Sequence, residues 1–296
     1  MKTKKILIAG GSGLIGSRLK THLVSLGHEV DVLSRKESKD YIHWDLAKGY
    51  IDASKIQETQ ILINLCGEGI AEKNWTSSRK KALLDSRVET AKLLFKYVDE
   101  MPFLEQYISA SGITCYGYKE KPEGYTEDDP LGEDYISQLV KKWESSADLF
   151  ASKVPVAKVR TGIVLSSNGG AIEKMIKPVR YGLGAALGSG KQIIPWIHID
   201  DLSRIFSHLI EHGSQGTFNA CANNDTNKNF MNTLAKVLGK RNWLPAVPEF
   251  LLKMMLGQMA TLILKGVHVS NEKIQRTNFK FEYVELNEAL KSLNLK

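Results

Sequence analysis

The sequence predicts an α/β protein: a doubly wound parallel sheet with a smaller C-terminal α/β lobe. Three observations carry this prediction. An apolar strand pattern near the N-terminus turns into a helix at a glycine cluster, strand and helix patterns then alternate, and the alternation ends after Ser166. The chain has 296 residues, enough for one large domain or two small ones. We expect the sheet domain to comprise residues 1–166 and 197–221, and the lobe residues 167–196 and 222–296.

The first strand is the apolar run that begins at Ile6, and it stops at Gly10-Gly11-Ser12-Gly13 before the helix pattern of residues 14–26. One glycine of such a turn permits a positive φ, a second lets the main chain approach a diphosphate, and a third lets helix and strand pack closely. The N-terminus of the helix adds free N–H groups and partial positive charge. The stretch therefore predicts a Rossmann-type dinucleotide site, and a strand–helix turn without a ligand is the alternative.

The second strand, residues 29–33, ends in Ser34-Arg35-Lys36. Proteins that bind NAD in this way usually place an acid there, which accepts hydrogen bonds from the ribose 2′-hydroxyl. A carboxylate would repel a 2′-phosphate, whereas a guanidinium can bind one with paired hydrogen bonds. We therefore predict NADP(H) as the cofactor. The alternative is that Arg35 and Lys36 form only a charged loop.

The remaining elements of the sheet domain follow from apolar runs and helical spacing. The predicted strands are 42–45, 60–65, 106–112 and 156–160, with 162–165 continuing the last, and the predicted helices are 76–98 and 134–152. In an open parallel sheet, ligands bind beyond the carboxyl ends of the strands. The loop at Cys66-Gly67 should therefore share an edge with the first glycine turn.

The C-terminal part has fewer strand patterns. Asp200-Asp201 is the expected N-cap of a helix over 202–211, and residues 216–220 form a strand. The apolar stretch 250–264 is interrupted by Lys253 and Gln258, so it is too short and too polar for a membrane span. We predict a buried helix there, with a partner-binding helix as the alternative. Three further helices are expected at 170–176, 230–238 and 286–293.

Composition narrows the class of protein. The chain is 43% hydrophobic and 25% charged, and its net charge of +7 comes from 40 basic and 33 acidic residues that are scattered. We therefore expect a small-molecule substrate, and we expect neither nucleic acid nor a membrane as a partner. A homodimer is one assembly that the sequence leaves open. Three widely spaced cysteines show no metal-ligand spacing and suit a reducing cytoplasm, so we expect no metal and a cytoplasmic location.

An ordered series of motifs resembles the extended short-chain dehydrogenase/reductases of the sugar-nucleotide epimerase type. The match is best to their atypical branch, which carries a C-terminal domain of unknown function (the DUF1731 type), and it covers nearly the whole chain. Its anchors are the run 10–16, Asn64-Leu65-Cys66-Gly67-Glu68 (usually Asn-Leu-Ala-Gly-Glu), Asp85-Ser86-Arg87, Ser109-Ala110-Ser111, Tyr116-Gly117, Arg160-Thr161-Gly162 and Trp196-Ile197-His198.

The resemblance implies NADP(H) held at the glycine turn, the end of the second strand and the loop after the fourth. The implied cofactor-binding residues are Gly10, Ser12, Gly13, Leu14, Ile15, Ser34, Arg35, Leu65, Cys66, Gly67, Arg87 and Ser109. For Arg87, a surface salt bridge is the alternative.

The catalytic pattern of that family is incomplete in this chain. The family uses a Tyr and, four residues later on the same helix face, a Lys that lowers the pKa of the phenol. When the Glu that follows the Lys is aligned with Glu144, Val140 takes the place of the Lys and Ile136 that of the Tyr. Tyr135 and Lys141 are each displaced by one residue, which rotates a helical side chain by about 100°. The usual pair is therefore absent.

Two residues are candidates for the missing chemistry. Ser111 is the expected hydroxyl that polarises a substrate oxygen, and Tyr116 is the candidate replacement acid or base, with packing of the loop as its alternative. We expect His198 to be a buried, hydrogen-bonded histidine rather than a catalytic one. Arg160 could hold an anionic substrate group or bind an acid across the sheet.

Two functions remain open at this point. The first is an NADP(H)-binding, epimerase-like oxidoreductase that acts on a small carbonyl or sugar-type substrate without the Tyr-x-x-x-Lys pair. The second is a non-catalytic NADP(H)-binding sensor or regulatory protein. The loss of the pair favours the second function. The retained C-terminal lobe favours the first, and we place the enzyme slightly ahead.

Overall fold

The protein is described here from a computed structural model that covers residues 2–35 and 39–295; Lys36, named above beside Arg35, lies outside them. Its main sheet has the strand order β10-β7-β6-β5-β1-β2-β3-β4, in which only β3 and β4 pair antiparallel. This confirms the predicted parallel sheet. The strands are β1 (Lys5–Ala9), β2 (Glu29–Ser34), β3 (Ile42–Asp45), β4 (Tyr50–Ile51), β5 (Ile61–Asn64), β6 (Gln106–Gly112), β7 (Val156–Thr161) and β10 (Gly216–Ala220).

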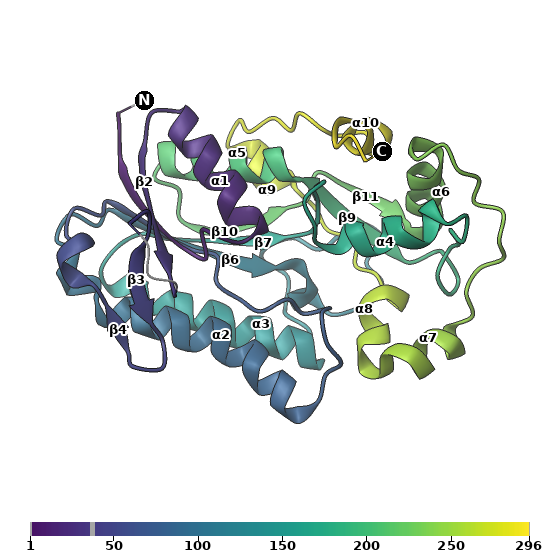
Figure 1. The fold of residues 1–296 in the computed structure, drawn as a ribbon, viewed down its shortest axis with the longest axis horizontal. Coiled ribbons are helices and arrows are strands. Elements are labelled where there is room, and N and C mark those ends of the chain that lie inside the picture. Colours follow the sequence, from purple (N-terminus) through teal and green to yellow (C-terminus); the bar gives the residue numbers. More distant parts are fainter. Residues whose placement is uncertain (1, 36–38, 296) are drawn as a thin grey trace.

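Helices cover both faces of this sheet (Figure 1). One face carries α1 (Leu14–Ser25) and α5 (Ile199–Glu211), and the other carries α2 (Ser77–Lys96) and α3 (Tyr135–Ala147). The side chains of β1 show why both faces are covered. Successive side chains of a strand point to opposite faces of the sheet. Ile6 and Ile8 join the core under α1 and α5, whereas Leu7 and Ala9 join the core under α2. Both faces of β1 are therefore buried, as its continuous apolar run predicts.

The strand order reverses at β1. This strand lies between β2 and β5, and the chain reaches its two neighbours by crossovers in opposite directions. The reversal leaves the carboxyl ends of β1, β2 and β5 as the topological switch point, where open α/β sheets bind their ligands.

A second sheet corrects one sequence prediction. Residues 162–165 do not continue the sixth strand: β8 (Ile163–Leu165) belongs to a three-stranded sheet with β9 (Ile193–His198) and β11 (Asn223–Thr226). The chain changes sheets at Gly162, where a Cβ atom would lie 2.9 Å from the carbonyl oxygen of Pro195. A glycine is needed there because the backbone of β9 occupies that space.

The remaining helices follow Ser166 in the sequence. The helices are α4 (Ala171–Arg180), α6 (Asn227–Val237), α7 (Glu249–Leu256), α8 (Thr261–Leu264), α9 (Glu272–Arg276) and α10 (Leu286–Ser292). The 3₁₀ turns of the whole chain are η1 (Ala53–Lys55), η2 (Val98–Glu100), η3 (Ile113–Tyr116), η4 (Asp148–Ser152) and η5 (Gly257–Ala260). Across residues 2–35 and 39–295, no helix combines the length and apolarity that a membrane span requires.

The prediction of one buried helix over 250–264 is wrong. Gly257 adopts a φ of +53°, ends α7 and starts a 3₁₀ turn before α8. In α7, Phe250, Met254 and Met255 are 67%, 75% and 69% exposed, so this helix lies at the surface. The apolar composition of the stretch reflects an exposed apolar face rather than a core position, a distinction that local composition does not encode.

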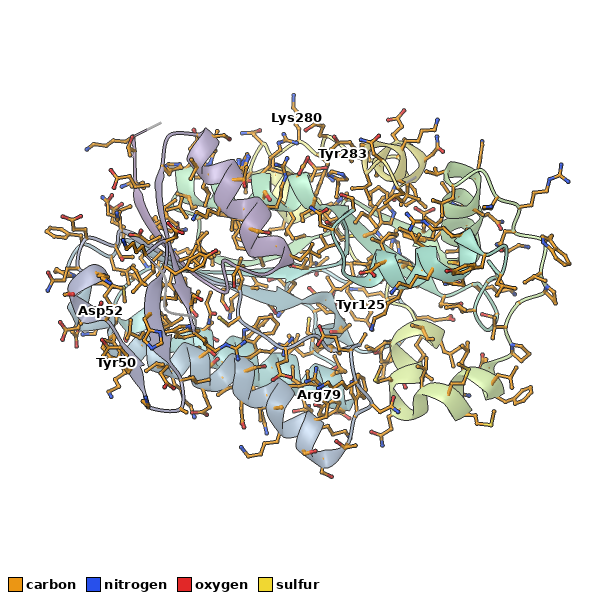
Figure 2. The ribbon with its side chains drawn as sticks, in the orientation of Figure 1. Tyr50, Asp52, Arg79, Tyr125, Lys280 and Tyr283 are labelled. Carbon is orange, nitrogen blue, oxygen red and sulfur yellow. The ribbon has the colours of Figure 1, made fainter. Side chains whose placement is uncertain are left out.

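The start of α5 also differs from the prediction. The helix begins at Ile199, and its N-cap is His198, whose Nδ1 accepts a hydrogen bond from the N–H of Asp200 at 3.2 Å. Asp201 is fully buried and binds the C-terminal segment instead. Its carboxylate accepts hydrogen bonds from the backbone N–H groups of Glu282 and Tyr283, each at 2.9 Å. Tyr283 lies on the side of the molecule that carries α1 and α5 (Figure 2).

Replacement of Asp201 with alanine should lower the free energy of unfolding by about 2–3 kcal/mol, because it removes a fully buried carboxylate that accepts hydrogen bonds from two backbone N–H groups. Urea unfolding followed by circular dichroism measures this loss. Asp200→Ala is the matched control: Asp200 pairs with the half-exposed Arg18, so its loss should cost less than about 1 kcal/mol. Equal losses in the two variants would contradict the anchoring role of Asp201.

Candidate nucleotide site

The glycine turn after β1 is shaped by its neighbours. Gly10 has a φ of +81°, and a Cβ atom there would lie 3.0 Å from the carbonyl carbon of Leu65 and 3.1 Å from the nitrogen of Cys66. At Gly16, a Cβ atom would lie 2.4 Å from the carbonyl oxygen of Gly10, so this glycine permits close packing of helix on strand. Gly13, by contrast, is exposed. The backbone of Gly13 is therefore accessible to a ligand that approaches the turn.

The N-terminus of α1 has the properties of an anion site. Gly13 is its N-cap, no side chain caps the first turn, and that turn contains no acidic residue. Ser12 is exposed, and Leu14 and Ile15 are half-buried. Backbone N–H groups and the positive end of the helix dipole therefore point to an accessible position, which suits a diphosphate.

Two arginines from different elements contribute positive charge at the loop after β5. Burial raises the pKa of the Cys66 thiol to about 12, and the positive charges of Arg35 and Arg87 both oppose this rise. Both guanidinium groups are therefore close enough to act on Cys66. Arg35 is exposed and follows Ser34, which is buried at the end of β2; Arg87 comes from α2.

Arg87 is a buried cation. Its side chain is 5% exposed, and it donates hydrogen bonds to the carbonyl oxygens of Leu83 and Glu68, both at 2.9 Å. Its guanidinium carbon lies 4.8 Å from the ring centroid of Trp143, and a Cβ atom at Gly67 would approach it to 2.8 Å. The alternative prediction, a surface salt bridge, is therefore wrong.

The environment of Arg87 lacks a compensating anion. Within the described ranges it has no carboxylate partner, and its Nε atom has no hydrogen-bond acceptor. Burial lowers the pKa of this guanidinium to about 10. A buried charge without a partner is costly, so the site is electrostatically suited to a negatively charged ligand.

The loop between β5 and α2 is held by side chains that the sequence reasoning missed. The buried Asn64 accepts a hydrogen bond from the N–H of Cys66 at 3.1 Å and donates one to the Tyr107 hydroxyl at 3.1 Å. Arg79 pairs with Glu68 and donates to the carbonyl oxygen of Gly69 at 2.7 Å. Arg79 lies on the α2 side of the sheet (Figure 2). The feature of the sequence that could have identified this role is Asn64, a polar residue at the end of an apolar strand.

The other cofactor residues implied by the resemblance lie at the same edge. Leu65 and Cys66 are half-buried and Gly67 is exposed. Ser109 is 1% exposed, and its hydroxyl donates to the carbonyl oxygen of Ala110 at 2.9 Å. Its assignment to the cofactor stays a prediction.

The two catalytic candidates belong to a buried polar network. Ser111 on β6, Arg160 on β7 and Asn219 on β10 occupy one register across three adjacent strands. Arg160 binds Glu144 of α3 through two hydrogen bonds of 2.8 Å, so it binds an acid across the sheet. Burial raises the pKa of Glu144, but hydrogen bonds and charge from Arg160 outweigh it and hold the pKa below its usual range.

Both candidate hydroxyls are engaged inside this network. Ser111 donates to Glu144 at 2.5 Å. Tyr116 donates to Asn219 at 2.7 Å and accepts from Arg160 at 2.9 Å, and its side chain is 2% exposed. Burial raises the pKa of the Tyr116 phenol. Their catalytic roles stay predictions, and the geometry favours the packing alternative for Tyr116.

The helix face where the Tyr and Lys would stand is apolar. Ile136 and Val140 are both fully buried in one hydrophobic cluster of α3 and the neighbouring loops. His198 is also buried, as expected, with hydrogen bonds to the N–H of Asp200 and the hydroxyl of Ser292. It therefore has the structural role that the sequence favoured.

Comparisons with known families and proteins agree with this architecture. The model of the NAD dependent epimerase/dehydratase family matches residues 6–221, and that of a domain of unknown function, DUF1731, matches residues 247–293. The human epimerase family protein SDR39U1 is 36% identical to this chain, covering 98% of it and 99% of the human protein. The epimerase family protein YfhF of Bacillus subtilis is 32% identical, covering 97% of each chain.

Solved structures give the same result. The crystal structure of human SDR39U1 with NADPH superposes with a TM-score of 0.89 at 34% identity and covers 98% of both chains. The nucleoside-diphosphate sugar epimerase of Corynebacterium glutamicum superposes with a TM-score of 0.81 at 26% identity, covering 99% of this chain and 58% of that one. A UDP-glucose 4-epimerase of Thermotoga maritima, 16% identical, shares the fold.

Proposed function

Since this chain belongs to the NAD dependent epimerase/dehydratase family, we propose that it binds NADP(H) at the switch point and acts as an oxidoreductase on a small carbonyl or sugar-type substrate. The observation that carries the proposal is the buried Arg87 at the loop after β5, which has no carboxylate partner among the described residues and whose Nε has no acceptor. The charges of Arg87 and Arg35 are suited to the phosphates of a dinucleotide.

The residues present fit this cofactor. The uncapped N-terminus of α1 suits the diphosphate, with Gly13, Leu14 and Ile15 supplying backbone N–H groups. Arg35, beside Ser34, suits the adenosine 2′-phosphate, because its guanidinium can donate paired hydrogen bonds. When bound, the cofactor would supply or accept a hydride. The human relative that was solved with NADPH supports the choice of nucleotide.

A fluorescence titration tests the choice of cofactor. We expect NADPH to bind at least tenfold more tightly than NADH. Arg35→Ala should weaken NADPH binding about tenfold and leave NADH binding unchanged, because a hydrogen bond to a charged group contributes about 1.5–3 kcal/mol. Lys39→Ala, which removes a nearby exposed cation, is the control and should bind NADPH as the wild type does. Tighter binding of NADH would overturn the assignment of Arg35.

A second function, a non-catalytic NADP(H)-binding sensor or regulator, is favoured by the apolar face at Ile136 and Val140. Turnover of an added panel of carbonyl compounds distinguishes the two. Tight NADPH binding without any turnover would favour the sensor. The proposal also includes a cytoplasmic location, for which the argument is that Cys66, Cys115 and Cys221 carry free thiols.

A further inference from the structure

One buried tyrosine hydroxyl has no partner. Among the described residues, Tyr118 is the tyrosine whose buried hydroxyl neither donates nor accepts a hydrogen bond. Leaving a buried donor unsatisfied costs about 1–3 kcal/mol, and an orphan of this kind in a native protein requires an explanation. The hydroxyls of Tyr116, Tyr107 and Tyr135 all have hydrogen-bond partners.

Tyr118 is held beside the N-terminus of α3, beyond the carboxyl end of β6. Gly117, which precedes it, adopts a φ of +74°, and a Cβ atom there would lie 3.3 Å from both Asp134 Oδ2 and the Cα of Gly132. This turn therefore requires glycine. Asp134 is the N-cap of α3, the helix on which the missing Tyr and Lys would stand.

The C-terminal segment brings a lysine to the same phenol. The Lys265 ammonium lies 5.7 Å from the centroid of the Tyr118 ring. Gly266, the next residue, is pressed against β9, because a Cβ atom there would lie 2.3 Å from the nitrogen and the oxygen of Ile193. The backbone next to Lys265 is thus held against β9, and a tyrosine and a lysine from separate segments lie together near the N-terminus of α3.

An apolar cluster lies on α3, the helix whose N-terminus is beside Tyr118. Partly buried residues from four segments pack against the hydrophobic cluster of Ile136 and Val140: Ile70, Trp75, Leu131, Tyr135 and Leu262. Leu262 lies on α8, just before Lys265, and Tyr135 directly follows Asp134. A ligand that reached Tyr118 beside this cluster would contact apolar side chains and few polar groups, an environment that suits compounds with apolar bodies.

We propose that Tyr118 is the proton donor to the carbonyl oxygen of a substrate with an apolar body, and that Lys265 positions and electrostatically assists this phenol. The inference rests on the proposed function. In the reducing direction, the carbonyl carbon gains a hydride from the reduced cofactor, which is oxidised, and the oxygen gains the proton of Tyr118. The phenolate then regains a proton from water, so that one alcohol is formed for each cofactor oxidised.

A titration that does not depend on turnover tests the position of Tyr118. Protein carrying 3,5-difluorotyrosine in place of Tyr118 is titrated by ¹⁹F NMR, once with NADP⁺ and once with NADPH. The oxidised nicotinamide is positively charged and stabilises a nearby phenolate, so we expect a pKa about one unit lower with NADP⁺. The same label in place of the half-exposed Tyr50 of β4 is the control and should titrate equally with both. Equal pKa values at position 118 would overturn the proposal.

Turnover of benzaldehyde, cyclohexanone and glyceraldehyde tests the catalytic role of Tyr118, the assistance by Lys265 and the substrate class. Tyr118→Phe should lose at least 100-fold in rate while binding NADPH as the wild type does, and the two apolar carbonyls should be reduced faster than glyceraldehyde. Lys265→Met should slow turnover, and Lys265→Arg should restore it. Full turnover by Tyr118→Phe, or a loss confined to Tyr116→Phe, would overturn the role of Tyr118. Faster reduction of glyceraldehyde would overturn the substrate class. Failure of the wild type to bind either cofactor would instead refute the proposed function itself.

Discussion

Replacement of Arg160 with methionine should lower the free energy of unfolding by about 3–5 kcal/mol at pH 8, because it leaves the Glu144 carboxylate buried without its partner. Both side chains are almost fully buried, and their two hydrogen bonds of 2.8 Å join β7 to α3. Chemical denaturation measures the loss. Lys158→Met is the matched control on the same strand: its pair with the exposed Asp148 should contribute less than about 1 kcal/mol.

The effect should depend on pH in a defined sense. In the wild type, the folded protein holds the pKa of Glu144 below its usual 4.5, so the pair stabilises the fold above that pH, and this contribution is lost as the pH falls through the lowered value. In Arg160→Met the main influence that lowers the pKa of Glu144 is gone, and we expect burial to outweigh the remaining hydrogen bond from Ser111 and the charge of Lys158, so that the pKa rises. Protonation then relieves the cost, so the difference from wild type should shrink between pH 8 and pH 4. A difference independent of pH would contradict this explanation.

Replacement of Arg87 with methionine should weaken NADPH binding about 100-fold, since removal of a buried, charged hydrogen-bond donor costs about 2–5 kcal/mol of binding free energy. The same change removes an unpaired buried cation, so the variant without cofactor should unfold no more easily than the wild type. Lys81→Met, which removes an exposed cation of the same helix, should leave NADPH binding unchanged.

The two readouts for Arg87 separate its roles. A residue that only holds the loop at Glu68 would lose stability on replacement and retain its affinity for the cofactor. Lost stability with unchanged NADPH affinity would therefore contradict the role of Arg87 in binding. A loss of affinity with retained stability is the result that an anion site predicts.

The architecture followed from local patterns because each pattern is satisfied by contacts that it implies. The run at Ile6 predicts a strand buried on both faces, and the glycines after it predict a turn that only glycine fits. The errors occurred where contacts with a distant segment determine the local structure. The chain leaves the main sheet at Gly162, where the backbone of Pro195 leaves no room for a side chain, and α7 is exposed although its composition is that of a core helix.

The site was predictable to the same extent. Arg35 follows a strand end and could be placed from the sequence, whereas the burial of Arg87 depends on Trp143 of another helix. The pairing of Ser111 with Glu144, and of Tyr116 with Asn219, depends on register across three strands. The spacing of residues along the chain does not predict such contacts. The two hydroxyls were therefore predicted to be free for catalysis, although both are hydrogen-bonded in the fold.

A crystal structure of the protein grown with NADPH tests the central claim most directly. We predict the diphosphate against the backbone N–H groups of Gly13, Leu14 and Ile15, and the 2′-phosphate within hydrogen-bonding distance of the Arg35 guanidinium. A nucleotide bound elsewhere, or a 2′-phosphate that contacts neither Arg35 nor Arg87, would contradict it.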